Sequence, residues 1–135
     1  MATIAHRSFG IAWLVFAVAL AVHVADEAKH DFLSTYNPTV RAIRARLPFL
    51  PIPTLTVKRW LGQLIAGIAL LFALSPLAFA GSHPLRLAAW PLAIVVGIFN
   101  AGLHFGTSAY YRRCMPGVYS SPLLLAASIF LLAAS

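Results

Sequence analysis

The stretch Ile11–His30, IAWLVFAVALAVHVADEAKH, decides the fold of this chain. No charged residue lies between Arg7 and Asp26, and this apolar run is long enough to predict a helix that crosses a bilayer. The three acidic residues of the chain, Asp26, Glu27 and Asp31, all follow directly. A carboxylate costs about 2.5–3.5 kcal/mol at the centre of a membrane helix and less near its ends, so such groups are functional candidates.

Four ionisable side chains of this stretch share one side of the predicted helix. At 100° per residue, His23, Glu27 and His30 fall within an arc of about 60°, and Asp26 widens the arc to about 100°. Nothing in the sequence breaks the helix before Asn37-Pro38, so we expect it to continue through His30.

The composition indicates an integral membrane protein. Of the 135 residues, 61% are hydrophobic and only 10% are charged, with a mean hydropathy of +0.85. The net charge of +7 favours a membrane surface over nucleic acid as the partner, because the basic residues lie between apolar segments. A single cysteine, Cys114, excludes an internal disulfide, a cysteine-based zinc site and an iron–sulfur cluster. Acidic Asp26 and Glu27 follow the first run in place of a cleavage site, so we expect a retained span.

Four apolar segments predict an all-α membrane protein, a four-transmembrane-helix bundle in a single domain over residues 1–135. The predicted spans are about 9–30, 60–80, 85–108 and 118–134. Most of the tryptophan and tyrosine residues are expected in an aromatic belt at the membrane interfaces.

The connection between the first two spans predicts a short amphipathic interfacial helix. Asn37-Pro38 is a favourable helix start, with Asn as the cap and Pro at the first position. Val40 and Ile43 then recur at helical spacing, opposite Arg41 and Arg44. A Pro-rich segment over residues 48–53 follows, which cannot be helical throughout.

The distribution of basic residues predicts an orientation. Eight of the ten Lys and Arg residues lie in the connections between spans one and two and between spans three and four. Only Arg7 and Arg86 lie on the opposite side. The positive-inside rule therefore places both basic connections in the cytoplasm and both termini outside, in a multi-pass protein of the bacterial inner (plasma) membrane.

A second polar cluster lies at the end of the third predicted span. Asn100 and His104 are four residues apart and share one helical face. In an alternating topology the first and third spans run in the same direction, so their C-terminal ends reach the same leaflet. We therefore expect Asn100 and His104 to meet the polar residues that end the first span.

One chemical use of this arrangement is a divalent metal site. The His-x3-Glu and Glu-x2-His spacings present imidazole and carboxylate groups to one ion, and the third span supplies a further imidazole. The candidate ligands are His23, Glu27, His30 and His104. Zinc or iron suits such ligands, and Asp26 or Asn100 would orient them.

Two other uses stay open. One is metal-free acid–base catalysis by the candidate catalytic set, which comprises His23, Asp26, Glu27, Asn100 and His104. The other is a bis-histidine haem on His23 and His104, which the neighbouring carboxylates make less favourable.

These motifs resemble the HXXEE-motif family of small bacterial and archaeal membrane proteins. The family's signature His-x-x-Glu-Glu corresponds to His23-Val24-Ala25-Asp26-Glu27, and a second signature is similar to Asn100-x3-His104. The turn Pro116-Gly117-Val118-Tyr119 also resembles the family, and the likeness covers most of the chain. It implies a polar, enzyme-like site within the membrane but no established reaction. Asp26 stands where the family has Glu, and its shorter arm favours a supporting role over direct ligation.

The sequence thus predicts an enzyme that acts on a lipid or another hydrophobic small molecule at the cytoplasmic leaflet. The reaction class would be metal-assisted hydrolysis or proton-transfer isomerisation. Glu27 would be the acid–base group or metal carboxylate, His23 and His104 the ligands or proton shuttles, and Asn100 the residue that orients substrate. The alternatives are a small accessory or assembly subunit of a larger membrane complex, with or without self-association, and a haem carrier.

Overall fold

The computed structural model describes residues 2–135, and in this part of the chain the secondary structure is helical, without strands. The elements are α1 Ala2–Lys29, α2 Phe32–Arg46, α3 Val57–Ala73, α4 Ser75–Phe79, α5 His83–Pro91, a π-helical segment η1 Leu92–Phe99, α6 Asn100–Tyr111 and α7 Ser121–Ala134. The prediction of an all-α protein is confirmed.

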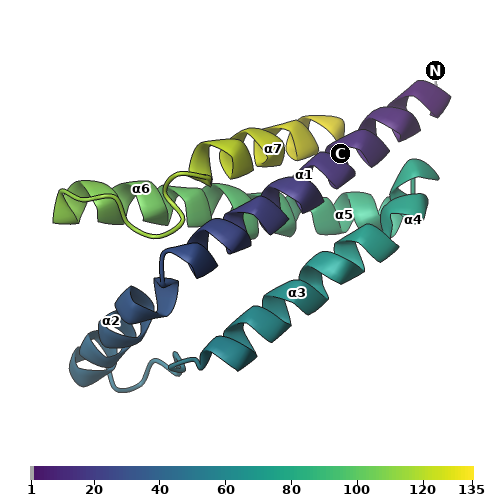
Figure 1. Ribbon diagram of the computed structural model, residues 1–135. Helices are drawn as coiled ribbons and strands as arrows, with labels where there is room; N and C mark the ends of the chain where they lie inside the picture. The colour runs from purple at the N-terminus through teal and green to yellow at the C-terminus, as the bar shows by residue number, and fades with distance from the viewer. Residues whose placement is uncertain (1) are drawn as a thin grey trace.

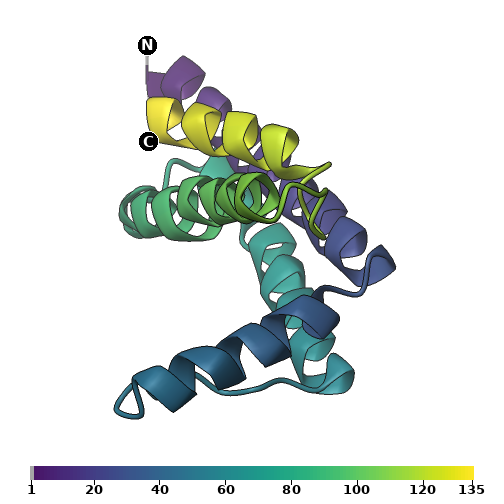
Figure 2. The same cartoon turned by 90° about the vertical axis from the view of Figure 1, so that its left-hand side faces the viewer.

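Helix α1 is the central element of the fold (Figure 1). It packs against α7, α4 and α3, and α7 also packs against η1 and α6. Both termini and the α4–α5 turn lie at one end of the molecule, here called the terminal end (Figure 1). Helix α2 and the α6–α7 connection lie at the opposite end, the loop end. Figure 2 shows α2 beside the start of α3 and well separated from α7.

Two helices are long and apolar enough to cross a membrane. They are residues Ile4–Lys29 and the continuous rod His83–Tyr111, which comprises α5, η1 and α6. Helix α7 is apolar but shorter, with 14 residues. The second predicted span is divided into α3 and α4 near Leu74, because Pro76 has no N–H to continue the helical ladder.

The chain leaves α1 earlier than the sequence predicted. The first helix ends at Lys29, and Asp31 adopts a left-handed conformation with φ 52° that separates α1 from α2. Helix α2 then begins at Phe32, so the predicted start at Asn37-Pro38 was wrong and Pro38 lies inside the helix. Asn37 does not cap a helix because its amide is used elsewhere. It donates to the carbonyl of Leu55 at 2.8 Å and accepts from the N–H of Leu55 at 2.8 Å.

The core of the bundle is built around one face of α1. Phe9, Trp13 and Phe16 are fully enclosed there. The indole N–H of Trp13 donates to the main-chain oxygen of Leu71 at 2.8 Å, which fastens α1 to the end of α3. Trp13 and Trp60 are both buried, so these two tryptophans do not belong to the predicted aromatic belt. An aromatic ring buried in the core removes more apolar surface from water than a ring at the membrane interface does.

The π-helical segment lets α7 approach the third rod closely. Ala93, Gly97 and Ala101 are buried at intervals of four residues. Residues spaced four apart on an α-helix are rotated progressively around its axis. The wider π-helical turn reduces this rotation, so the three residues stay closer to one face. A Cβ atom at Gly97 would collide with the hydroxyl of Ser128 on α7. Small side chains and the π segment together therefore set the position of α6, which carries Asn100 and His104.

Candidate metal centre

The loop end of the bundle brings three buried ligand groups together. His23 and Glu27 come from one face of α1, and His104 comes from α6. Glu27 Oε1 lies 3.1 Å from His104 Nε2 and 3.7 Å from His23 Nε2. All three side chains are almost fully enclosed, with relative exposures of 1%, 5% and 6% for His23, Glu27 and His104.

The spacing of these three groups suits a metal ion. One ligand atom from each of them lies within 4.8 Å of the other two. Two ligands bound tetrahedrally at about 2.0–2.2 Å from zinc would be about 3.4 Å apart, close to the two measured separations. The group could therefore hold a metal ion. Two imidazoles and one carboxylate form a donor set that both zinc and iron accept.

The hydrogen bonds of Ser120 fix the tautomer of His23. The Asp26 carboxylate accepts from the N–H of Ser120 at 3.0 Å and from its hydroxyl at 2.7 Å. A hydroxyl has one proton, and the charged Asp26 oxygen at 2.7 Å is a better acceptor for it than the main-chain oxygen of Gly117 at 3.2 Å. The Ser120 oxygen, 2.9 Å from His23 Nδ1, must then accept from that ring nitrogen. His23 consequently has its proton on Nδ1 and a lone pair on Nε2, the form that binds metals.

Asn100 and Asp26 lie beside the three candidate ligands rather than among them. Asn100 Nδ2 donates to His23 Nε2 at 3.0 Å. Asp26 reaches His23 only through Ser120.

His30 is separated from the three buried ligands. Its Nδ1 lies 2.8 Å from Asp26 Oδ1, and its side chain is 39% exposed. The helical wheel had placed His30 with His23 and Glu27 on the assumption of an uninterrupted helix. Because α1 ends at Lys29, the ring turns instead toward Asp26 and the exposed ring of Tyr119, whose centroid is 5.4 Å away.

Two elements outside the ligand helices hold His104 in place. Gly117, with φ 84°, passes so close that a Cβ atom there would lie 2.6 Å from His104 Cε1. The ring of Phe32 at the start of α2 lies 6.1 Å from the His104 ring, and it stacks on Trp60 at 5.6 Å. The α6–α7 loop and the α1–α2 turn thus enclose the imidazole from different sides.

Sequence reasoning missed Ser120 and the packing role of Gly117. Neither has a distinctive spacing relative to His23, since 97 residues separate Ser120 from His23. A weak signal was available in Ser120-Ser121-Pro122, a polar pair directly before an apolar helix.

A bis-histidine haem does not fit this geometry. The rings of His23 and His104 are 4.9 Å apart between centroids, at an angle of 72°. Glu27 Oε1 lies within 3.7 Å of a nitrogen on each ring. A porphyrin held between the two rings would need the space that the carboxylate fills.

Comparison with known proteins gives no match. No model of a known protein family matches the chain, and none of the curated proteins or solved structures is significantly similar to it. The function of this protein is therefore inferred from the site itself.

Proposed function

We propose that this protein is a small multi-pass membrane enzyme whose centre is a divalent metal ion on His23, Glu27 and His104. The observation that carries the proposal is the convergence of these three buried side chains from two helices, with ligand atoms within 4.8 Å of one another. Enclosing a carboxylate in an apolar bundle is costly unless it is paired or bound to an ion. The resemblance to the HXXEE motif is a further reason to expect a polar site in a membrane protein of this size.

The reaction class that we propose is hydrolysis of a lipid or another hydrophobic substrate. A bound zinc or iron ion would polarise an ester or phosphoryl oxygen and activate water. The chain's own residues have separate roles. Ser120 holds His23 with its lone pair on Nε2, and Glu27 supplies the carboxylate ligand between the two imidazoles. Substrate would reach the buried centre when Phe32 moves off His104.

A metal-free proton-transfer isomerase is the second candidate, and one contact favours it. The amide of Asn100 already donates to His23 Nε2 at 3.0 Å, so that nitrogen has a partner without any ion. Within the described residues, each buried side-chain nitrogen and oxygen has a hydrogen-bond partner. In this version Glu27 and His104, 3.1 Å apart, exchange the proton. Binding of a metal ion to His23 requires the Asn100 amide to move away.

The proposed setting is a four-span bundle in the inner membrane. Residues Ile4–Lys29 and His83–Tyr111 are the two strongest candidate spans, and α3 with α4 and the short α7 would complete the bundle. The two basic connections lie at the loop end, where the site is, and the positive-inside rule assigns that end to the cytoplasm. The centre would then act at the cytoplasmic leaflet.

Metal binding tests the first candidate directly. The protein is purified in mild detergent, stripped with a chelator and titrated with Zn²⁺, and the metal content before stripping is measured by mass spectrometry. We expect about one equivalent per chain. His104→Ala and Glu27→Gln should each weaken Zn²⁺ binding by more than about 100-fold, because loss of a ligand exceeds the 10–100-fold effect of losing an outer partner.

His83→Ala is the matched control, since this exposed histidine lies at the terminal end and should leave Zn²⁺ binding unchanged. A wild-type protein that binds Zn²⁺ no more tightly than Glu27→Gln would overturn the metal centre. Such a result would leave the isomerase version, which predicts that Asn100→Ala abolishes turnover.

A further inference from the structure

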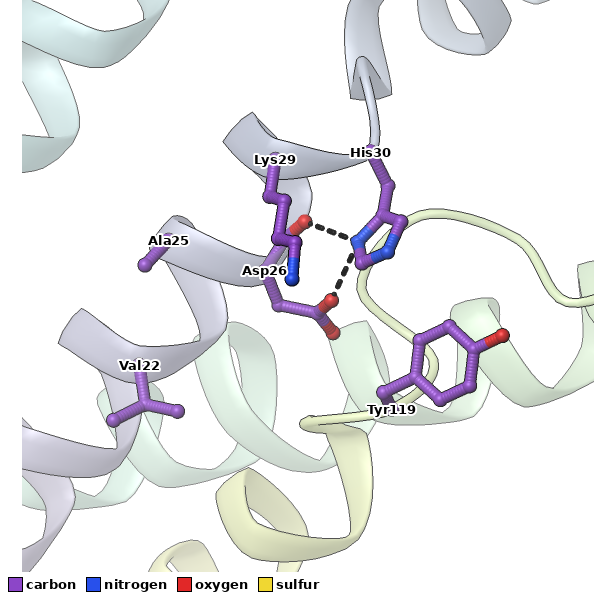
Figure 3. Close-up of a pocket in the computed structure, with 6 residues that line it drawn as sticks. All are labelled: Val22, Ala25, Asp26, Lys29, His30 and Tyr119. Atoms are coloured by element: carbon purple, nitrogen blue, oxygen red, sulfur yellow. Dashed lines mark hydrogen bonds and ion pairs between the residues drawn. The ribbon is translucent and has the colours of Figure 1, made fainter.

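A groove on the outer side of α1 lies next to the metal centre but does not belong to it. Val22, Ala25, Asp26, Lys29 and His30 of the α1 segment line it, together with Tyr119 of the α6–α7 loop. Its volume is about 510 Å³. Figure 3 shows Lys29, His30 and Tyr119 around the Asp26 carboxylate, with Val22 and Ala25 farther back along the helix.

The groove continues into an apolar stripe along α1. Ile11, Val15, Val18 and Val22 recur at intervals of three or four residues and are all exposed, by 38–50%. These positions fall on one side of the helix, the side that also carries Lys29. At 1.5 Å per residue, the stripe from Ile11 to Val22 is about 17 Å long, which is about half of a 30 Å hydrocarbon core. The stripe therefore matches the length of an acyl chain in one leaflet.

At the polar end of the groove, Lys29 carries a positive charge that is not used in an ion pair within the described residues. Asp26 is engaged by Ser120 and His30. A second hollow of about 220 Å³ adjoins the first across His30, and Arg113 and Ser34 are among its lining residues. Cationic and hydroxyl groups at the end of an apolar stripe complement a negatively charged head group on a hydrocarbon tail.

We infer that this groove binds a phospholipid with an anionic head group, in the leaflet at the loop end. The phosphate lies at Lys29, and one acyl chain follows the stripe from Val22 to Ile11. The inference depends on α1 crossing the membrane, and it does not depend on the metal centre.

Lipid binding is tested on delipidated protein in mild detergent by native mass spectrometry. Phosphatidylglycerol and phosphatidylcholine with identical acyl chains are the two probes. We expect phosphatidylglycerol to bind about fivefold more tightly, the effect of one basic residue at a membrane surface. Lys29→Gln should bring the ratio close to one. Lys58→Gln removes the same charge from an exposed position at the start of α3 and should preserve the preference.

Equal binding of the two lipids by the wild-type protein would overturn the inference, as would an equal loss of preference in Lys29→Gln and Lys58→Gln. A second copy of the chain on the stripe is the competing occupant. Disulfide cross-linking of Val18→Cys in a Cys114→Ser background, at high yield in native membranes, would identify that occupant and also overturn the inference. His104→Ala should keep the lipid preference, and Lys29→Gln should keep Zn²⁺ binding, so failure of one proposal is distinguishable from failure of the other.

Discussion

At the terminal end, the side chain of Arg86 donates to main-chain oxygens, whereas in the buried cluster at the loop end the side chains of His23, Ser120 and Asn100 bind one another. Arg86 Nη1 lies 3.0 Å from the oxygen of Ala134 and 3.2 Å from that of Ser135, and Nη2 lies 3.3 Å from that of Ala5. The guanidinium also lies 4.6 Å from the centre of the Phe9 ring. Any residue could supply these carbonyl oxygens. The Arg86 contacts hold helix ends together and do not depend on which residues supply the oxygens. The contacts of the loop-end cluster depend on the identity of each side chain.

The largest expected effect comes from Gly117→Ala at the loop end. A side chain there must adopt φ 84° and would press on the His104 ring. The left-handed backbone and the overpacking together should cost about 2–4 kcal/mol of unfolding free energy and weaken Zn²⁺ binding. Thermal unfolding in detergent and Zn²⁺ titration measure the two effects. Gly102→Ala is the control on α6, because a Cβ atom there meets nothing within 4 Å and should be neutral or stabilising.

Arg86→Met should destabilise the protein without affecting the metal centre. Methionine retains much of the apolar length but loses the hydrogen bonds to Ala134 and Ala5. We expect a loss of about 1.5–3 kcal/mol in unfolding free energy, the range for hydrogen bonds to a charged group. Zn²⁺ affinity of the folded protein should be unchanged. A marked loss of Zn²⁺ affinity in this variant would show that the two ends are not independent.

Ser120→Ala should mainly lower Zn²⁺ affinity, whereas Arg86→Met should mainly lower the unfolding free energy. Without the hydroxyl, His23 loses the acceptor that holds its proton on Nδ1. We expect Zn²⁺ affinity to fall about 10–100-fold, the usual effect of removing an outer partner of a histidine ligand. Ser121→Ala is a closely matched control, because this neighbouring buried hydroxyl donates to the oxygen of Gly117 instead. If both variants lose affinity equally, the tautomer argument for His23 is wrong.

The smallest effect is a gain of stability from Asp31→Gly. Asp31 adopts φ 52° between α1 and α2, and its side chain makes no capping hydrogen bond to α2. Glycine adopts this conformation without the steric cost of about 1–2 kcal/mol, although it adds entropy to the unfolded chain. We expect a net gain of about 0.5–1 kcal/mol in thermal unfolding. A destabilised variant would indicate that the Asp31 carboxylate contributes to the loop end.

The sequence predicted the helical class because long apolar runs indicate membrane helices. It pointed to His23, Glu27, Asn100 and His104 because polar and ionisable side chains are rare in such runs. It did not predict the break after Lys29, since no glycine or proline marks that position and the change depends on one backbone conformation at Asp31. The π-helical segment was also missed. Its consequence depends on contact between Gly97 and Ser128, and contacts across helices leave little trace in local periodicity.

Main-chain partners account for two further differences between the sequence and the structure. Asn37 resembled a helix cap, yet its amide binds the backbone of Leu55. Trp13 resembled an interfacial aromatic residue, yet its indole binds the oxygen of Leu71 inside the core. A carbonyl oxygen has the same chemistry at every residue, so a sequence pattern cannot reveal which one a side chain will find.

The contact between His23 and Ser120 also has a consequence for biosynthesis. His23 is synthesised 97 residues before Ser120, which directly precedes α7. During synthesis, His23 and Glu27 are already in place while their partners from α6 and the α6–α7 loop have yet to appear. Until α7 is inserted, His23 is free to change tautomer. A metal ion on His23, Glu27 and His104 would therefore be held only after α6 and the α6–α7 loop have packed against α1.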